Sequence, residues 1–457
     1  MDPLDLGTRI LALLVPILDR LSHRRERKKR PGVRLEVDLP ENMMWESQTD
    51  LRFSLRISGS TSRQLQSGLE LLRAGKFADA LAQFERAETG GAKDFRLLNL
   101  KSITLYRLQR YQEALDASKA AARLKPEDPD VQVNLANALR KLGHERNAIG
   151  RYRKTIATSS ANIAAVFNLA DAHREGGHPT VALTYYDKAL KLDPSRSDVW
   201  NNRAIALIDL GQYARAEESL RRALQNWPNH VHALSNLSKL LAGLRRYDES
   251  IRLAERALKL SPDDITAWHS KAFSLSKKRS FAEAAQAYRE VLKRNSSDAG
   301  ALGELGSLEV MLGDHPNAEA HLTAALAGGF DRARGYVDLG SLRFRQGRFP
   351  EGMRLSVRAL ITRPPRWIRS VAYSNMAFVF FTYRKYLQGE ASARRALLFN
   401  AENAAAWNSL AGCLYELGDE QGSRDAIDRA IALEPDNPVF IKNRGELMKK
   451  RQPQERQ

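Results

Sequence analysis

The chain has 457 residues, of which 43% are hydrophobic, so it can bury a continuous core. Its formal net charge of +18 is compatible with nucleic-acid binding through the phosphates, although basic and acidic residues interleaved on solvated helix surfaces give the same total. The single cysteine, Cys413, excludes an internal disulfide framework and a zinc site built on cysteines. Because Trp407, Leu410 and Leu414 surround it in an apolar helical pattern, we expect Cys413 to be a small core side chain in a reducing compartment.

Residues 1–21 form the one strongly apolar segment of the chain. The run from Ile10 to Leu18 is nine residues, well short of the ~20 that span a bilayer. Asp2 and Asp5 precede the run and a basic cluster follows it, an order opposite to that of a secretory signal. We therefore predict a short apolar helix and neither a cleaved signal nor a mitochondrial presequence.

Residues 23–30, HRRERKKR, carry six lysines or arginines in eight positions. An apolar helix followed by such a run can lie on an anionic membrane surface. It can equally dock on a partner or on a second copy of itself, with the basic run as a solvated linker. Residues 1–30 are thus predicted to be an apolar helix and a polybasic linker of a cytoplasmic protein, and peripheral membrane association stays open.

Two alternating stretches follow, VRLEVDL at 33–39 and LRFSLRI at 51–57. Apolar residues at every second position predict two half-buried strands. Glu36 and Asp38 can pair with Arg52 and Arg56 across the ladder. We therefore predict a β-hairpin over residues 31–60, whose apolar face must rest on the rest of the chain, a second subunit or a partner, since a lone hairpin is marginal in water.

From residue 61 the sequence repeats with a period of 34 residues. Repeats start at 61, 95, 129, 163, 197, 231, 265, 299 and 333, and, after three extra residues, at 370 and 404. Positions 8 and 20 of all eleven repeats are Gly, Ala or Ser, so two helices can approach closely there. In the repeat at 197, Gly211 falls where the first helix must end with a positive φ.

This pattern resembles the tetratricopeptide repeat over residues 61–437. The resemblance implies an all-α, right-handed solenoid of about eleven helix-turn-helix repeats, whose first helices line a concave groove. The repeat at 299 has glycines on its first helix, and PPRWIR at 364–369 breaks the spacing. We therefore predict a front array at 61–298, a back array at 299–437, and a capping helix and tail at 438–457.

The sequence offers no catalytic constellation, phosphate-binding glycine loop or metal-binding histidine pair. We therefore expect a protein that is not an enzyme and holds no cofactor and no metal. The carboxylate clamp of some tetratricopeptide repeats is not intact, because Val133 and Asp198 stand where lysines are needed. Capture of acidic chaperone C-termini is accordingly not expected.

Position 6 is asparagine in four consecutive repeats, at Asn134, Asn168, Asn202 and Asn236. One amide per repeat could pair with the backbone of an extended peptide. This ladder is similar to that of the O-linked N-acetylglucosamine transferase superhelix, a resemblance that implies peptide binding along the groove. The competing interpretation is that asparagine recurs here simply as part of the repeat consensus.

Four residues around the ladder complete the predicted peptide-binding set: Asn137, Arg140, Arg174 and Lys239. Their charge predicts an acidic peptide. The leading hypothesis is a non-enzymatic scaffold that binds such a peptide and is tethered through its N-terminus. The alternatives are a basic solenoid that binds RNA, and a regulatory subunit of an enzyme complex.

Overall fold

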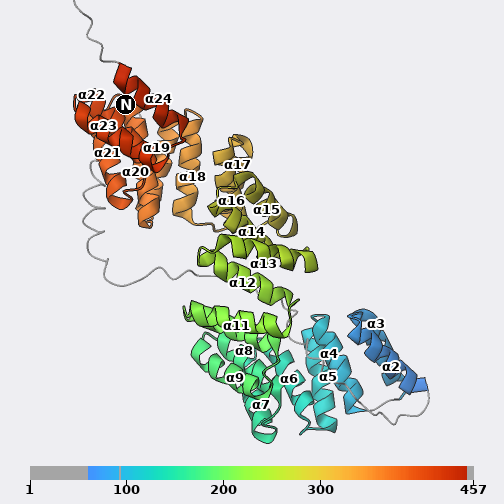
Figure 1. The fold of residues 1–457 in the computed structure, drawn as a ribbon. Coiled ribbons are helices and arrows are strands. Elements are labelled where there is room, and N and C mark those ends of the chain that lie inside the picture. Colours follow the sequence, from blue (N-terminus) through green and yellow to red (C-terminus); the bar gives the residue numbers. More distant parts are fainter. Residues whose placement is uncertain (1–59, 92–93, 450–457) are drawn as a thin grey trace, which may run out of the picture. The chain divides into compact units, whose positions relative to one another are not determined.

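The computed structural model describes residues 60–91 and 94–449, and all regular secondary structure in these ranges is helical (Figure 1). The helices are α2 (Ser60–Arg73), α3 (Phe77–Thr89), α4 (Phe95–Arg107), α5 (Tyr111–Leu124), α6 (Pro129–Lys141), α7 (Glu145–Thr158), α8 (Ile163–Glu175), α9 (Pro179–Leu192), α10 (Ser197–Asp209), α11 (Tyr213–Asn226), α12 (Val231–Gly243), α13 (Tyr247–Leu260), α14 (Ile265–Lys277), α15 (Phe281–Arg294), α16 (Ala299–Leu312), α17 (His315–Ala327), α18 (Arg332–Arg345), α19 (Phe349–Ile361), α20 (Arg366–Thr382), α21 (Tyr386–Phe399), α22 (Ala404–Glu416), α23 (Glu420–Leu433) and α24 (Pro438–Lys449).

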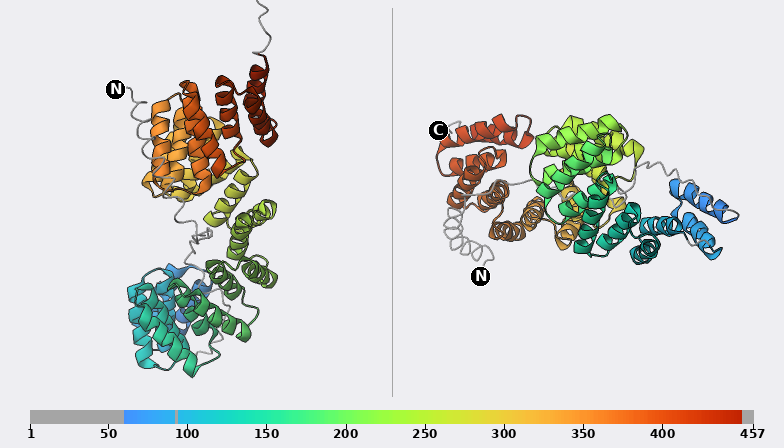
Figure 2. Two further views of the ribbon diagram at one scale, coloured as in Figure 1. Left: turned by 90° about the vertical axis from the view of Figure 1, so that its left-hand side faces the viewer. Right: turned by 90° about the horizontal axis from the view of Figure 1, so that it is seen from below.

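Each predicted repeat is one helical hairpin, and α24 follows the last of them as the expected capping helix. Successive hairpins pack against each other within two compact units, which divide the described residues between Ala267 and Trp268 (Figure 2). We call residues 60–267 the front unit and residues 268–449 the back unit. The prediction of an all-helical repeat solenoid is confirmed, and a joint at residue 299 stays a prediction.

Polar caps and positive-φ turns mark the ends of the helices, as the repeat pattern requires. The residue before a first helix is often Asp or Asn, and its side chain accepts a backbone N–H of the first turn, as at Asp94, Asp128 and Asn162. Gly211 has a φ of 72°, so the predicted left-handed turn after α10 is confirmed.

The small residues at positions 8 and 20 face each other inside the hairpins. Ser238 at position 8 donates to the backbone oxygen of Ser250 at position 20, with an oxygen–oxygen distance of 2.8 Å. A Cβ atom added to Gly352 at position 20 would lie 2.2 Å from the ring of Phe344. Close helix approach therefore accounts for the small side chains in the sequence pattern.

Two irregularities of the sequence have a structural reason in the back unit. A Cβ added to Gly303 of α16 would lie 2.4 Å from the ring of Phe330, so this glycine admits an aromatic side chain against the helix. The three extra residues before the repeat at 370 extend its first helix, α20, to 17 residues, whereas first helices such as α10 have 13.

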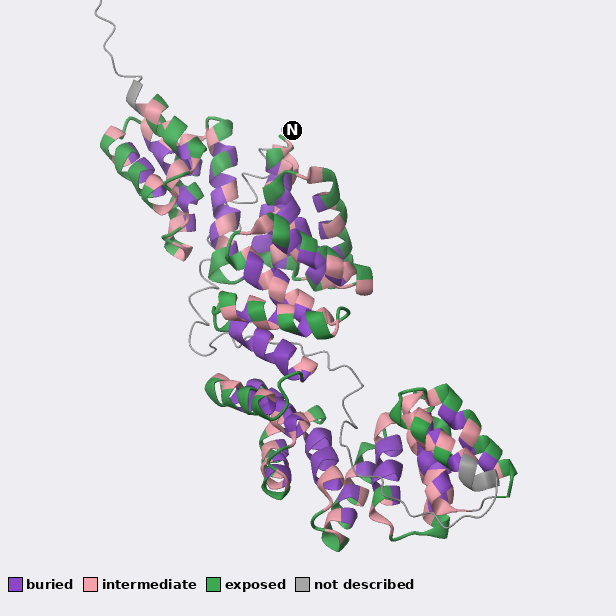
Figure 3. Cartoon of the chain, turned by 45° about the vertical axis from the view of Figure 1, so that its right-hand side comes forward, coloured by how far each residue is buried: buried purple, intermediate pink, exposed green. Residues whose placement is uncertain are grey.

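The buried residues of each unit lie on the helix faces that meet neighbouring helices (Figure 3). In the front unit Leu207, Leu220 and Leu237 belong to one such cluster. In the back unit Cys413 is fully buried, which confirms it as a core side chain.

Cys413 is expected to resist thiol reagents in the folded chain and to react at once on unfolding. Burial raises the pKa of its thiol to about 12, so the reactive thiolate is scarce at pH 8. Reaction with Ellman's reagent at pH 8, with and without 8 M urea, measures this. Stoichiometric reaction within seconds in the absence of urea would contradict the buried position.

The predicted apolar helix, basic linker and β-hairpin lie outside the described residues, apart from Ser60, which begins α2. The tail after Gln452 lies outside them as well. Among the helices that are described, none is long and apolar enough to cross a membrane.

Candidate functional site

The predicted asparagine ladder lies on the first helices of the front unit, and its side chains are buried. Exposed fractions range from 2% for Asn168 to 8% for Asn236. Asn134 donates to Asn99 Oδ1 at 2.8 Å, and Asn236 donates to Asn201 Oδ1 at 2.9 Å. These amides therefore tie one first helix to the first helix before it.

Asn202 makes the same kind of link, because its Nδ2 lies 3.1 Å from Oδ1 of Asp171 in the preceding repeat. Asn168 differs, since its Oδ1 is buried without a hydrogen-bond partner among the described residues. The donors of three ladder asparagines are thus engaged within the chain. A bound peptide would have to use the other polar groups of this face.

A cluster of charged side chains surrounds the middle of the ladder. Arg140 is 7% exposed, and its Nη1 lies 2.8 Å from Glu175 Oε2. The Nη2 atom of Arg174 lies 3.8 Å from the other oxygen of Glu175. Asp171 accepts hydrogen bonds from Tyr186 and Asn202, and burial raises the pKa of its carboxyl group. Of the predicted site residues, Arg140 and Arg174 are brought together, because both contact Glu175.

Basic side chains recur in the last turn of three consecutive first helices. They are Arg107 on α4, Arg140 and Lys141 on α6, and Arg174 on α8. We call these four residues the basic row. Lys239, on α12, is half-buried two repeats further on. Asp198, which stands where the carboxylate clamp needs a lysine, pairs with Arg196, with 2.5 Å between Oδ2 and Nη2.

A small hollow opens beside the basic row, between α4 and α6. Its volume of about 10 Å³ has room for about one water molecule. It is lined by Ser102, Ile103, Tyr106, Arg107, Asn134 and Asn137. Asn137 is also the acceptor of the Tyr152 hydroxyl at 2.5 Å. The hollow is therefore lined by two of the predicted asparagines, Asn134 and Asn137, and by one residue of the basic row, Arg107.

Sequence reasoning missed the residues that hold these side chains in place. Asn99 and Asn201 stand at position 5, one residue before the ladder position, and accept its amides. Tyr152 and Tyr186 reach the first helices from the second helices of their own hairpins. The recurrence of asparagine at position 5, again at Asn408, was the signal available for this contact.

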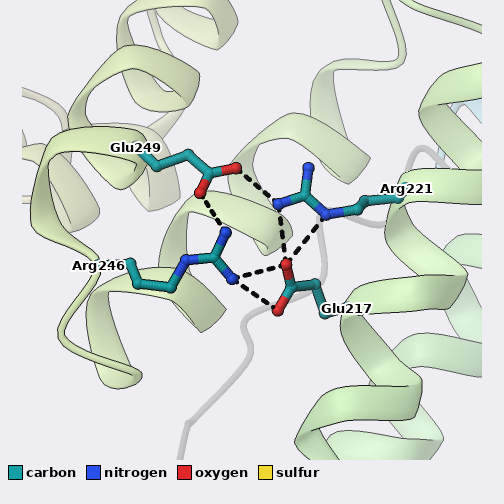
Figure 4. Close-up of polar contacts among 4 residues, drawn as sticks. All are labelled: Glu217, Arg221, Arg246 and Glu249. Atoms are coloured by element: carbon teal, nitrogen blue, oxygen red, sulfur yellow. Dashed lines mark hydrogen bonds and ion pairs between the residues drawn. The ribbon is translucent and has the colours of Figure 1, made fainter.

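On two consecutive second helices, α11 and α13, opposite charges neutralise each other. Glu217 and Arg221 of α11, Glu249 of α13 and Arg246 at the N-cap of α13 form a closed network of ion pairs (Figure 4). Arg221 Nη2 lies 2.6 Å from Glu249 Oε1, and Arg246 Nη1 lies 2.8 Å from Glu217 Oε1. Because two arginines meet two glutamates, this surface adds no net charge.

The back unit holds a partly buried ionic cluster between α16 and α18. Arg334 Nη2 donates to Glu304 Oε2 at 2.7 Å, and its Nε lies 3.7 Å from Asp338 Oδ2. Ser307 donates to the same oxygen of Asp338 at 2.5 Å. Burial raises the pKa of Asp338 to about 6, although Arg334 acts in the opposite direction.

Replacing Asp338 by asparagine is expected to stabilise the back unit at pH 7.5 by roughly 2 kcal/mol. Between pH ~4, where an unfolded aspartate titrates, and pH ~6 the folded chain keeps a proton that the unfolded chain has lost. The contribution of Asp338 to the free energy of unfolding therefore falls as the pH rises through that window. Asparagine does not titrate, so the variant does not lose this stability. Thermal unfolding at pH 7.5 and 4.5 measures it, with Asp436→Asn as the exposed control. An equal gain at both pH values would contradict the assignment.

No group of three or more histidine, cysteine, aspartate or glutamate side chains suited to a metal ion occurs within residues 60–91 and 94–449. In the front unit, the amide, carboxylate and guanidinium groups are joined by hydrogen bonds and ion pairs. It can recognise polar and acidic groups through amides and guanidinium groups.

A family model described as "Tetratricopeptide repeat" matches residues 65–129, 133–197, 201–265, 271–333 and 380–438, well over half of the chain. The chain belongs to the tetratricopeptide repeat family. No curated protein matches it. Tetratricopeptide repeats are therefore identified by the sequence pattern, the family model and the hairpin architecture together.

The chain is similar to solved structures of low sequence identity. The APC/C hetero-tetramer Cut9–Hcn1 is similar at 13% identity and a TM-score of 0.51, covering 86% of this chain and 91% of that chain. The human IFIT1 dimer with m7Gppp-AAAA has 16% identity and a TM-score of 0.46 over 84% of this chain and 92% of that chain. A tetratricopeptide repeat protein of Parabacteroides merdae has 21% identity and a TM-score of 0.42, covering 55% and 99%.

Proposed function

We propose that this tetratricopeptide repeat protein is a non-enzymatic scaffold whose front unit binds an extended, acidic segment of a partner protein. The segment would cross the last turns of α4, α6 and α8. The observation that carries the proposal is the basic row, Arg107, Arg140, Lys141 and Arg174, beside the hollow that Asn134 and Asn137 line.

Each part of this surface has a separate task in the proposed complex. Arg107 and Lys141 would attract and hold the carboxylates of the approaching peptide, because complementary charge raises the association rate. Arg140 and Arg174 are fixed by Glu175, so their guanidinium groups are already oriented. The unpartnered Oδ1 of Asn168 would accept a peptide N–H once the neighbouring side chains part. The remaining ladder amides keep the first helices in register.

Fluorescence anisotropy with the full chain tests the proposal. The probes are 12-residue peptides of Ser, Ala and Gly with four glutamates, and the same peptides with four lysines. Only the acidic peptides are expected to bind, and Arg107→Glu with Lys141→Glu should weaken them at least tenfold. The control, Arg123→Glu with Arg153→Glu, changes the net charge equally through exposed residues of the second helices.

Equal binding of acidic and basic peptides, or equal loss in both variants, would reject the front-unit site. A single-stranded RNA 20-mer serves as the competing probe. Tighter RNA binding, with a steep salt dependence and loss in the Arg107→Glu, Lys141→Glu variant, would instead favour the nucleic-acid hypothesis.

A further inference from the structure

The first helices of the back unit differ in chemistry from those of the front unit. At position 9, Asn137 and Asp171 of the front unit are replaced by Phe378 in α20. At position 12, Arg140 and Arg174 give way to Phe381. The amides and guanidinium groups of the proposed peptide site thus have aromatic rings as their counterparts in this repeat.

Three rings gather where α19 meets α20, and we call them the aromatic patch: Phe349, Phe378 and Tyr383. The ring centroid of Phe349 lies 6.2 Å from that of Phe378 and 6.0 Å from that of Tyr383. The three rings support each other and join the second helix of one repeat to the first helix of the next.

Much of this surface is open to solvent. Phe378 is 46% exposed and Tyr383 is 38% exposed. Single exposed apolar residues are ordinary, but an adjoining group of exposed aromatic side chains is characteristic of interaction sites.

Basic residues accompany the aromatic patch in the chain. Arg345 and Arg348 precede Phe349, and Arg384 and Lys385 stand between Tyr383 and Tyr386. Of these four residues, Arg348 pairs with an acidic side chain, Glu351, at 2.7 Å. The charge beside the patch is therefore predominantly positive.

We propose that the aromatic patch is a second docking surface, for a partner protein segment with apolar anchors flanked by acidic residues. The anchors would cover Phe378 and Tyr383, and the acidic flanks would meet Arg345, Arg384 and Lys385. Charge complementarity favours this occupant over a second copy of the chain. A symmetric dimer places the same patch on both sides, and these basic residues would then face each other.

Nucleic acid is the less suitable occupant of the patch. Bases bind by stacking on open ring faces. The rings here pack at tilted or edge-on angles, with 83° between Phe349 and Tyr383.

Anisotropy with the full chain and a fluorescein-labelled 16-residue peptide tests the inference. The probe has two phenylalanines four residues apart, flanked on both sides by glutamates. Phe378→Ser with Tyr383→Ser is expected to weaken its binding at least tenfold. Ile361→Ser with Leu398→Ser removes apolar side chains that are even more exposed elsewhere in the back unit and should change it less than twofold. Circular dichroism verifies the helices, and Tyr383→Ser alone serves if the double variant unfolds.

Several results would overturn the inference. One is equal binding after both phenylalanines of the probe are changed to alanine, and another is unchanged binding to the patch variant. A wild-type dimer in sedimentation velocity that Phe378→Ser with Tyr383→Ser dissociates would assign the patch to a second copy. Displacement of the peptide by an RNA 20-mer would point to nucleic acid. The Arg107→Glu, Lys141→Glu variant should bind this probe normally, so the two proposed sites can fail independently.

Discussion

Changing Arg334 to leucine is expected to destabilise the back unit by about 3 kcal/mol at pH 7.5, since removing one partner of a buried ion pair leaves uncompensated charge. Arg334 pairs with Glu304 and lies 3.7 Å from Asp338, while its guanidinium group lies 5.7 Å from the Phe330 ring centroid. Leucine keeps some apolar contact but leaves two carboxylates facing each other in a partly buried site.

Hydrogen exchange of α16 and α18 in the full chain measures this effect locally, which suits a repeat protein whose parts open separately. The loss should shrink toward pH 5, because Asp338, with a pKa of about 6, is then mostly protonated. Arg332→Leu is the matched control on the same helix, since Arg332 is exposed. Equal destabilisation by both changes, or a larger loss at pH 5, would contradict the ionic cluster.

Removing the two donors of Asp171 is expected to have the next largest effect. Tyr186→Phe and Asn202→Ala should each cost about 1–3 kcal/mol at pH 7.5, because a buried acceptor loses a hydrogen bond. The double variant should deviate from additivity, since both donors serve one carboxylate.

Urea unfolding at pH 7.5, followed by circular dichroism, gives the four free energies of this cycle. Tyr185→Phe is the control, because it removes the neighbouring hydroxyl while the ring still stacks on His173. Burial has already raised the pKa of Asp171, and the loss of donors should raise it further. Effects equal to that of Tyr185→Phe would show that the buried carboxylate does not depend on these donors.

The repeating features of the fold could be predicted because each depends on contacts inside one hairpin. Local geometry determines both the small residues at positions 8 and 20 and the positive φ of Gly211. The length of α20 could not be predicted, because the three extra residues could equally have formed a loop.

The candidate site was less predictable because its contacts join different repeats. The period shows that Asn134 and Asn236 occupy equivalent positions, but it does not fix how one repeat is rotated against the next. That rotation decides whether an amide faces the groove or the preceding helix, and the structure directs both toward asparagines at position 5. Likewise, Glu304 and Arg334 are 30 residues apart, with no local pattern that connects them.

Hydrogen exchange of the full chain with and without a saturating acidic 12-residue peptide locates the proposed peptide site. We expect added protection in α4, α6 and α8, little change in the neutral network of α11 and α13, and no change in α20–α22. The same measurement on the Arg107→Glu, Lys141→Glu variant should show no added protection at an equal peptide concentration. Protection confined to α20–α22, or absent from residues 95–175, would contradict a peptide site on the front unit.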